Sequence, residues 1–419
     1  PYYGKVKALA VYKTALTDAN LRSLTYPSAV ATTFDLNFNT IADDFTFTRG
    51  SEATFVNAQG LIQSTASNDA PRLDYSTGAK AFLLEPQSTN LLSYSELFSD
   101  SYWTKSGASV VSGFSSPSGD LSAFKLVEDT SNGGHNTYSQ TASVNNGATV
   151  TNSIIVKKGE NNWILLRNGY LDWGYYFDLE NGIVGQKSGP GSVDYSINAL
   201  TDGWYRISVT MQVPSTQANL HIYLVKSDGG SLSYTGDGTS GVYIYGAQSE
   251  QQSYPTSYIP TSGASATRNQ ELCNNATPVI NSEEGTLYAE IAGGNDGTFN
   301  YISLSDGGTT NYAGILYTDT NNEITYRYYV GGSGVQIVIS GINVTNFNKI
   351  AVKWKVNDFA IWINGIEVGT ASSGSLNPSG TFNQLSFARG GSNNTPFYGN
   401  TKGLKVYPKA LADVQLQDL

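Results

Sequence analysis

Side chains that could perform acid–base or metal chemistry are few in this sequence, and they are not grouped. The chain contains two histidines, His135 and His221, which are far apart in the sequence. No grouping of cysteines or aspartates gives either one the spacing of a metal site, so neither a histidine-based metal centre nor a serine–histidine triad is indicated. In the segment LHIYLVK, His221 alternates with Leu220 and Ile222, which places it on the strand face opposite the core.

Carboxylate pairs are the remaining candidates for hydrolysis, because a glycosidase places two carboxyl groups about 5–10 Å apart. In the segment FDLENG, Asp178 and Glu180 would share a strand face, but Glu180 adjoins an Asn-Gly turn, where acidic residues commonly serve solubility. Other acidic pairs are adjacent in the sequence, so on a strand their side chains point to opposite faces. The sequence therefore predicts no catalytic residues and a protein that is not an enzyme.

The loop YTGDGTSG is the candidate for a cation site, because Asp237 and Thr239 could supply oxygen ligands. Calcium takes six to eight oxygen ligands, usually with several carboxylates, and a single aspartate in a glycine-rich loop is more typical of a tight turn. We expect no metal and no cofactor, with a structural calcium ion as the open alternative. The single cysteine, Cys273, excludes an intrachain disulfide and is expected to be a small, inert apolar residue.

Aromatic side chains give the sequence its positive indication of binding. The segment NNWILLRNGYLDWGYYFDL is rich in Trp and Tyr, and its centre has the composition of turns, where core packing explains exposed rings least well. Rings stack on the apolar faces of pyranoses, while neighbouring polar groups bind sugar hydroxyls. The same composition is typical of protein–protein interfaces, which stay the alternative interpretation. The predicted carbohydrate-binding residues are Trp163, Tyr170, Trp173 and Tyr175.

Alternation along two further segments predicts which side chains share a sheet face. In WYRISVTMQV, Tyr205 belongs to one face, and Trp204 and Arg206 belong to the other. In LHIYLVK, the face opposite the core carries His221 and Tyr223. A sheet face on which Trp, Tyr, Arg, Thr and Gln are interspersed has the ingredients of glycan recognition.

The elements that would position these side chains are strands. The 419 residues are 39% hydrophobic and only 14% charged, with 44 Gly and 28 Tyr, which is typical of a β-rich, extracellular-type protein. Asn-Gly and Asp-Gly dipeptides recur between runs such as TVTNSIIVKK and GVYIYGAQ, as expected of hairpins. The predicted fold class is all-β, with jelly-roll or β-sandwich modules in tandem.

The charge balance limits the classes of partner. The formal net charge of −10 disfavours nucleic acid and anionic membranes, because both recruit clustered Lys and Arg. The sequence has no run of about 18 apolar residues, so no membrane insertion is expected.

A repeat suggests how the modules are arranged. Residues 1–24 and 396–419 share twelve identical positions, and in both copies an alternating segment leads into a short amphipathic stretch. The first copy is therefore expected to close an upstream domain. The predicted units are a closing strand and helix over 1–26, a connector of short strands and turns over 27–90, a jelly-roll domain over 91–268 and a second all-β domain over 269–419.

Several short sequence motifs resemble those of known families. The run FTFTRGSEATFVNAQGL, followed by APRLDY, GWYRISVT and YTGDGTSGVYIYGAQSEQQSYPTSYIP, resembles the head-spike-fibre type of domain of tailed bacteriophages over roughly residues 45–268. Residues 269–419, with EGTLYAEI and KIAVKWKVNDFAIWINGIEVG, resemble a concanavalin A-like or laminin-G-like sandwich.

The resemblance implies a structural component of a bacteriophage virion, such as a head or tail fibre or spike. Such proteins are expected at the virion surface, as homotrimers that contact other virion structural proteins and host-cell surface glycans. A trimer would repeat weak sites and gain avidity. Two alternatives are a non-binding structural or decoration protein that braces capsid or tail, and an ancillary carbohydrate-binding region of a polysaccharide-degrading enzyme.

Overall fold

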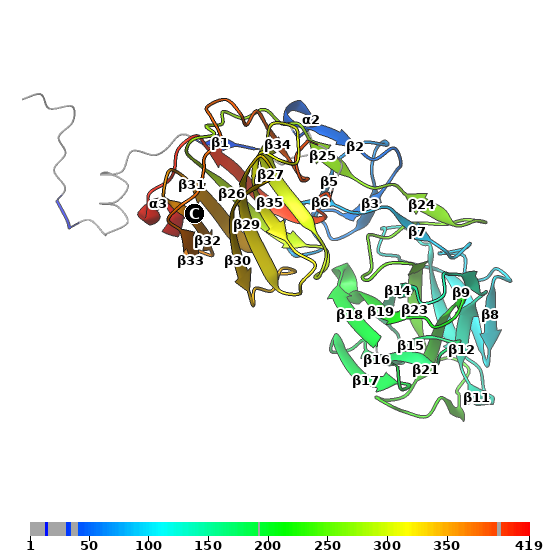
Figure 1. Ribbon diagram of the computed structural model, residues 1–419. Coiled ribbons are helices and arrows are strands. Elements are labelled where there is room, and N and C mark those ends of the chain that lie inside the picture. Colours follow the sequence, from blue (N-terminus) through cyan, green and yellow to red (C-terminus); the bar gives the residue numbers. More distant parts are fainter. Residues whose placement is uncertain (1–12, 16–30, 35–40, 192, 392–394) are drawn as a thin grey trace, which may run out of the picture.

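The computed structural model describes residues 13–15, 31–34, 41–191, 193–391 and 395–419. Most of the predicted closing segment, 1–26, lies outside these residues. Nearly all regular secondary structure of the described chain is strand, arranged in two β-sandwiches (Figure 1), which confirms the predicted all-β class. Among the described residues, no helix is long and apolar enough to cross a bilayer.

The first sandwich packs two antiparallel sheets face to face. We call them the β14 sheet, with strand order β18-β19-β14-β23-β10-β9, and the β15 sheet, with order β17-β16-β15-β21-β12-β8. The strands of the β14 sheet are β9 (Ala108–Phe114), β10 (Ala123–Glu128), β14 (Thr149–Lys158), β18 (Val193–Ala199), β19 (Trp204–Gln212) and β23 (Gly241–Glu250). Those of the β15 sheet are β8 (Trp103–Ser106), β12 (Asn136–Ser139), β15 (Trp163–Asn168), β16 (Trp173–Asp178), β17 (Ile183–Ser188) and β21 (Leu220–Val225). Short pairs at the rim are β11 (Asn132–Gly134) with β22 (Ser233–Thr235), and β13 (Ala142–Ser143) with β20 (Gln217–Ala218).

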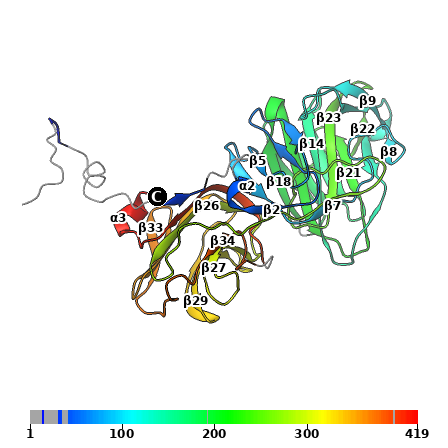
Figure 2. The same ribbon diagram turned by 90° about the horizontal axis from the view of Figure 1, so that it is seen from above.

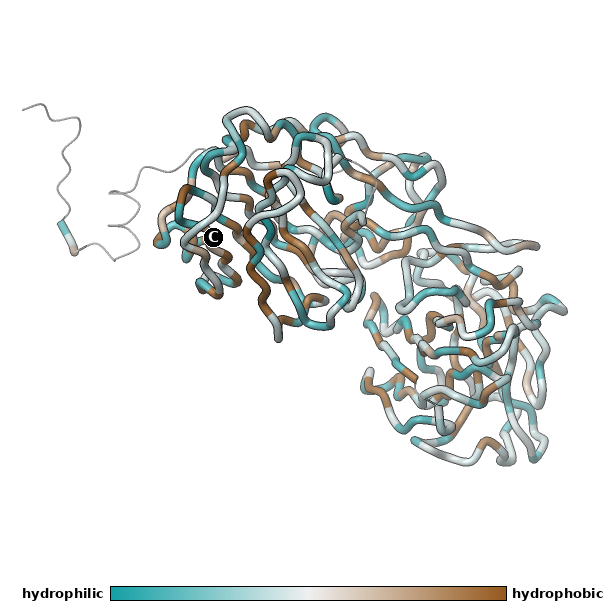
Figure 3. Tube along the Cα trace, in the orientation of Figure 1, coloured by the Kyte–Doolittle hydropathy of each residue, from teal (hydrophilic) through white to brown (hydrophobic). Residues whose placement is uncertain are grey.

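Alternation along the strands divides core from surface in the β15 sheet. Ile164 and Phe177 are fully buried between the two sheets, whereas Leu165, Tyr176 and Tyr223 meet on the opposite face of the β15 sheet. Hydrophobic stretches of chain occur in both sandwiches (Figure 3). The β15 sheet therefore has one face in the core and one face turned outward.

The second sandwich packs the β26 sheet against the β28 sheet. The β26 sheet runs β33-β32-β31-β26-β35-β6-β5, with β1 (Thr32–Thr33) also pairing with β35, and the β28 sheet runs β30-β29-β28-β27-β34. Its strands after residue 269 are β26 (Gly285–Gly293), β27 (Asn300–Ser305), β28 (Tyr312–Tyr317), β29 (Glu323–Val330), β30 (Ser333–Ser340), β31 (Asn348–Trp354), β32 (Phe359–Ile363), β33 (Ile366–Ala371), β34 (Gln384–Ser386) and β35 (Gly399–Tyr407). Helix α3 (Asp413–Gln417) follows β35 and buries Leu416.

The segment predicted as a connector, 27–90, is built into the second sandwich although it precedes the first in sequence. Strands β5 (Arg72–Asp74) and β6 (Ala81–Leu84) extend the β26 sheet through pairing of β6 with β35. The remaining elements are α2 (Ile41–Asp44), the β3–β4 hairpin (Thr54–Val56 and Ile62–Ser64), and β2 (Thr46–Thr48) and β7 (Ser88–Asn90), which pair with β25 (Leu272–Asn274) and β24 (Ala266–Arg268). In both views β5, the edge strand of the β26 sheet, lies on the side of the second sandwich that faces the first (Figures 1 and 2).

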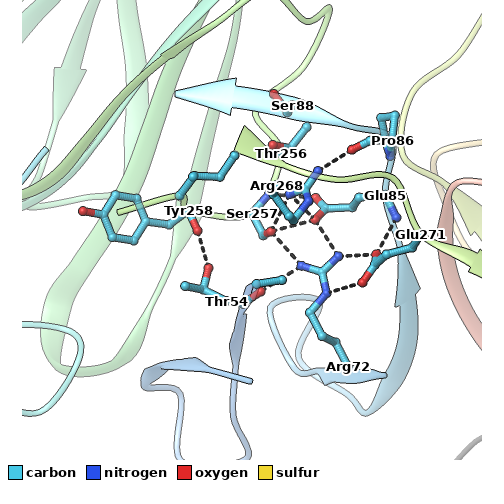
Figure 4. A network of polar contacts seen from close by, with 12 residues as sticks. Thr54, Arg72, Glu85, Pro86, Ser88, Thr256, Ser257, Tyr258, Arg268 and Glu271 are labelled. Atoms are coloured by element: carbon cyan, nitrogen blue, oxygen red, sulfur yellow. Dashed lines mark hydrogen bonds and ion pairs between the residues drawn. The ribbon is translucent and has the colours of Figure 1, made fainter. Parts of the chain in front are cut away.

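A buried network of ion pairs joins the connector to the chain that links the two sandwiches (Figure 4). Glu85 pairs with Arg72 at 2.8 Å and with Arg268 at 2.7 Å. Glu271 pairs with Arg49 at 2.9 Å and also with Arg72. Burial alone would raise the pKa of Glu85, but Arg268, Arg72 and hydrogen bonds from Ser257 lower it to about 2. The network stays ionised and fixes the connector at this junction.

Candidate functional site

The outward face of the β15 sheet gathers aromatic and polar side chains from three neighbouring strands. Arg167 on β15 lies opposite His221 on β21, and His221 lies opposite Tyr138 on β12. Tyr223, two residues after His221, shares this face because side chains on a strand alternate. We call Tyr138, Arg167, His221 and Tyr223 the outer face.

The rings and the guanidinium of the outer face contact one another. The imidazole of His221 lies 4.5 Å from the ring of Tyr138 and 5.9 Å from that of Tyr223, centroid to centroid. The Cζ atom of Arg167 lies 4.4 Å from the ring centroid of Tyr223, and its Nη2 donates to the Tyr223 hydroxyl at 2.9 Å. Asp172, in the turn after β15, pairs with Arg167 at 3.0 Å. The outer face is thus a continuous platform of rings with one cation.

Two buried donors of the outer face have no hydrogen-bond partner among the described residues. These are Nε of Arg167 and Nδ1 of His221. The amide of Asn219 accepts from Gly169 N through Oδ1 and directs Nδ2 to His221 Nε2 at 3.4 Å, so Nδ1 is the nitrogen that carries the proton. Unpartnered buried donors are costly, and a ligand acceptor such as a hydroxyl would satisfy them.

The electrostatics keep the imidazole neutral. Burial, with a smaller contribution from the charge of Arg167, lowers the pKa of His221 from 6.5 to about 4. At neutral pH His221 is therefore a polar ring that can stack and donate, while Arg167 supplies the positive charge of the outer face.

The loop between β21 and β22, which contains Gly230 and Leu232, lies beside the outer face. Tyr176 donates from its hydroxyl to Gly230 O at 3.3 Å, and Leu232 packs on the same cluster as Leu165 and Val225. Tyr223 belongs to the same cluster, so the loop borders the outer face at that residue.

The structure separates the four residues predicted to bind carbohydrate. Trp163 points to the outward side of the β15 sheet, where it packs beside Leu165, and Tyr170 is exposed in the turn between β15 and β16. Trp173 and Tyr175 lie on the inward side with Phe177, and Tyr175 packs against Tyr195 of the β14 sheet at 4.6 Å. The four residues do not form one surface, and their role in sugar binding stays a prediction.

Sequence reasoning identified part of the outer face. His221 and Tyr223 lie opposite the core, as the alternation of LHIYLVK predicts. Tyr138 and Arg167 were not singled out, because β12 is short and Arg167 directly follows the apolar run Trp163–Leu166 of β15. The alternation along β15 could have identified Arg167, because Trp163, Leu165 and Arg167 are two positions apart and therefore share one face of the strand.

A second aromatic group lies on the outward side of the β28 sheet and was also missed. Tyr301, Tyr312 and Tyr329 pack together, with ring centroids 6.3 and 5.2 Å apart. Arg327 donates to the Tyr301 hydroxyl at 2.7 Å, and Arg389 lies over the ring of Tyr312 at 5.4 Å. The alternation in EITYRYYV, with Arg327 and Tyr329 facing outward, is the sequence signal for it.

The loop considered for a cation uses its carboxylate within the turn. Asp237 accepts from Thr239 N and Ser240 N, both at 2.7 Å, and these hydrogen bonds lower its pKa. In the part of the chain that the structure describes, no group of three or more His, Cys, Asp or Glu side chains is placed to hold a metal ion.

Comparisons with known proteins give distant similarities. No protein-family model matches the sequence, and no curated protein matches it. Among solved structures, a candidate carbohydrate-binding protein from Bacteroides ovatus shares 14% identity over 65% of this chain and 80% of its own, with a TM-score of 0.28. Domains LG4-5 of the mouse laminin α1 chain share 10% over 68% of this chain and 90% of their own, with a TM-score of 0.23. A sialidase from Trypanosoma rangeli shares 9% over 75% of this chain and 62% of its own, with a TM-score of 0.27. These TM-scores are low, so the assignment of two β-sandwiches rests on the strand pairing described above.

Proposed function

We propose that this chain is a non-enzymatic, glycan-binding structural protein of a bacteriophage virion and that the outer face contacts host-cell surface sugars. The observation that carries the binding is the outer face itself. Three rings and a guanidinium stand outside the main core of their sandwich, and two buried donors there lack acceptors. The phage assignment is supported by the family resemblance of residues 45–268.

The proposed mechanism is adsorption without reaction. The rings of Tyr138 and Tyr223 would lie against the apolar C–H face of a pyranose, and Arg167 and His221 would donate to its hydroxyls. A single shallow site of this kind binds weakly. We propose that the protein is a homotrimer held at the virion surface by other virion proteins, so that three copies engage a glycan-coated cell together.

The test combines a glycan array with light scattering on the 419-residue chain. We expect a trimer that binds a restricted set of glycans, and Tyr223→Ala should weaken binding to a selected glycan about tenfold or more. Tyr195→Ala is the matched control, because Tyr195 is an exposed tyrosine of the same sandwich that lies away from the outer face.

The outcomes separate this function from its rivals. A trimer that binds no glycan would overturn the attachment role and favour a structural brace. A monomer that binds would favour an ancillary sugar-binding module. Equal losses in Tyr223→Ala and Tyr195→Ala would show that the outer face is not the site.

A further inference from the structure

A cavity of about 350 Å³ lies at the junction of the two sandwiches, away from the outer face. The β14 sheet contributes Ile155 and Arg206, the connector contributes Ile62 and Glu85, and the second sandwich contributes Thr345 and Asn400. The volume is at the lower end of the range of about 300–1,000 Å³ for small-molecule sites, which suits a single sugar ring.

The buried ion-pair network makes one wall of this cavity rigid. Glu85 and Ser257 line it, and both are held in the network of Figure 4. The carboxylate of Glu85 accepts from Ser257 N at 2.7 Å and from Ser257 Oγ at 2.6 Å, and it pairs with Arg72 and Arg268. Glu85 is therefore fully engaged by its own partners, and the wall is formed before any ligand binds.

Arg206 differs from the other arginines at this junction. Arg49, Arg72 and Arg268 each pair with a glutamate. Within the described residues, the guanidinium of Arg206 makes one hydrogen bond, from Nη2 to Ser153 Oγ at 3.1 Å, and no ion pair. Its Nε is buried without a partner. The cavity thus has in its wall a cation with no ion pair of its own. The charges of Glu250 and Glu85 offset it in part, and an anionic ligand would pair with it directly.

The second sandwich contributes an unpartnered hydrogen-bond acceptor to the lining of the cavity. Oδ1 of Asn400, on β35, is buried without a partner among the described residues. The lining also includes the apolar side chains of Ile62, Ile155 and Leu200. It further includes the carboxylate of Asp74, which accepts from Val56 N and Ser76 N. An occupant must therefore combine a negative charge, hydroxyl donors and an apolar face within the size of one ring.

We propose that the junction cavity binds a monosaccharide-sized sugar acid whose carboxylate pairs with Arg206 and whose hydroxyl donates to Asn400 Oδ1. This site is separate from the outer face and does not depend on the function proposed above. A bound sugar acid would bridge the two sandwiches, because Arg206 belongs to the first and Asn400 to the second. Binding of the sugar acid would therefore also stabilise the relative orientation of the two sandwiches.

The experiment is calorimetric titration of the 419-residue chain with D-glucuronate, D-glucose and inorganic phosphate. D-Glucuronate should bind with one site per chain, and D-glucose, which lacks the carboxylate, should bind about 10- to 100-fold more weakly. Arg206→Met should lose about the same factor for D-glucuronate, and Asn400→Leu should also weaken it. Lys158→Met is the matched control, since it removes an exposed cation of the same sandwich.

A thermal melt separates a binding role of Arg206 from a structural one. Because its guanidinium has no ion pair, Arg206→Met without ligand should melt no lower than the unaltered chain, and D-glucuronate should no longer raise its melting temperature. A large fall in melting temperature without ligand would show that Arg206 is structural and overturn the proposal.

Other results would also overturn it. Absence of D-glucuronate binding would do so, as would binding that survives Arg206→Met. Phosphate that binds as tightly as D-glucuronate would show an anion site without sugar recognition. Loss of binding in Arg167→Met but not in Arg206→Met would place the sugar acid on the outer face.

Discussion

The imidazole of His221 lies 4.5 Å from the ring of Tyr138, and Asn219 directs an amide N–H to its Nε2. The backbone of Gly169 also lies close to the ring, since a Cβ atom built there would lie 2.5 Å from the imidazole. These contacts hold the ring in place and leave it only partly exposed to water. They explain why the pKa of His221 is lowered to about 4, first by burial and then by the nearby Arg167.

The lowered pKa of His221 predicts a pH dependence of stability. Between pH 6.5 and about 4 the unfolded chain binds a proton at this histidine and the folded chain does not, so the free energy of unfolding falls as the pH is lowered through this window. We expect a loss of about 1–2 kcal/mol, allowing for the partial exposure of the ring. Urea unfolding at a series of pH values measures it.

His221→Gln provides the control for that titration, because glutamine does not ionise. Its free energy of unfolding should change less than that of the unaltered chain between pH 6.5 and 4. Both proteins should share a further loss from Glu85, whose depressed pKa stabilises the fold above its ordinary value of 4.5 and less as the pH falls through about 2. Parallel curves above pH 4.5 would contradict a neutral, buried His221.

The inward position of Trp173 predicts a stability effect. Its indole lies against the backbone of Gly191, where a Cβ atom would lie 2.1 Å from the ring, and it packs on the core of the first sandwich. Trp173→Ala should therefore lower the free energy of unfolding by about 2–3 kcal/mol, somewhat less than for a fully buried tryptophan. Tyr170→Ala, in the exposed turn beside it, should change it by less than about 0.5 kcal/mol. Urea unfolding decides between them, and an unchanged stability of Trp173→Ala would contradict the inward assignment.

The aromatic segment shows where sequence reasoning reached its limit. Composition identified NGYLDWGYYFDL as rich in rings, but the face of each ring depends on the residue at which the turn ends. Asp172 takes a positive φ of 55°, and β16 begins directly after it at Trp173. Because side chains alternate, one residue more in the turn would have exchanged the faces of Trp173 and Tyr176. Phe177, fixed in the core, sets the register, and only the folded structure reveals it.

The position of the connector in the fold was even harder to predict from the sequence. Short strands and turns over 27–90 were predictable from composition. Their partners were not, because β6 pairs with β35 more than three hundred residues later in the sequence. Local periodicity in the sequence does not indicate pairing between such distant strands. A buried charged residue such as Glu271 is predicted to lie on the surface until its partners are known, because charged residues are rarely buried.

Cys273 predicts a difference in reactivity between the native and unfolded chain. The thiol is fully buried in the core of the second sandwich on β25, and burial, with the charge of Glu271, raises its pKa. Ellman's reagent should leave the native protein unmodified over hours and should label one thiol per chain within minutes in concentrated guanidinium. Rapid labelling without denaturant would show that the β2–β25 pair opens locally.

Glu271 predicts the largest single loss of stability. Its carboxylate pairs with Arg49 at 2.9 Å and with Arg72, and it also accepts from Glu85 N at 2.8 Å. Glu271→Gln keeps the shape but leaves Arg49 without a carboxylate in a buried site, so the free energy of unfolding should fall by about 3–5 kcal/mol. Glu180→Gln is the matched control, because Glu180 pairs with Lys158 on the surface and should contribute about 0–1 kcal/mol. If the two substitutions cost the same in urea unfolding, the network would not hold the connector against the two sandwiches.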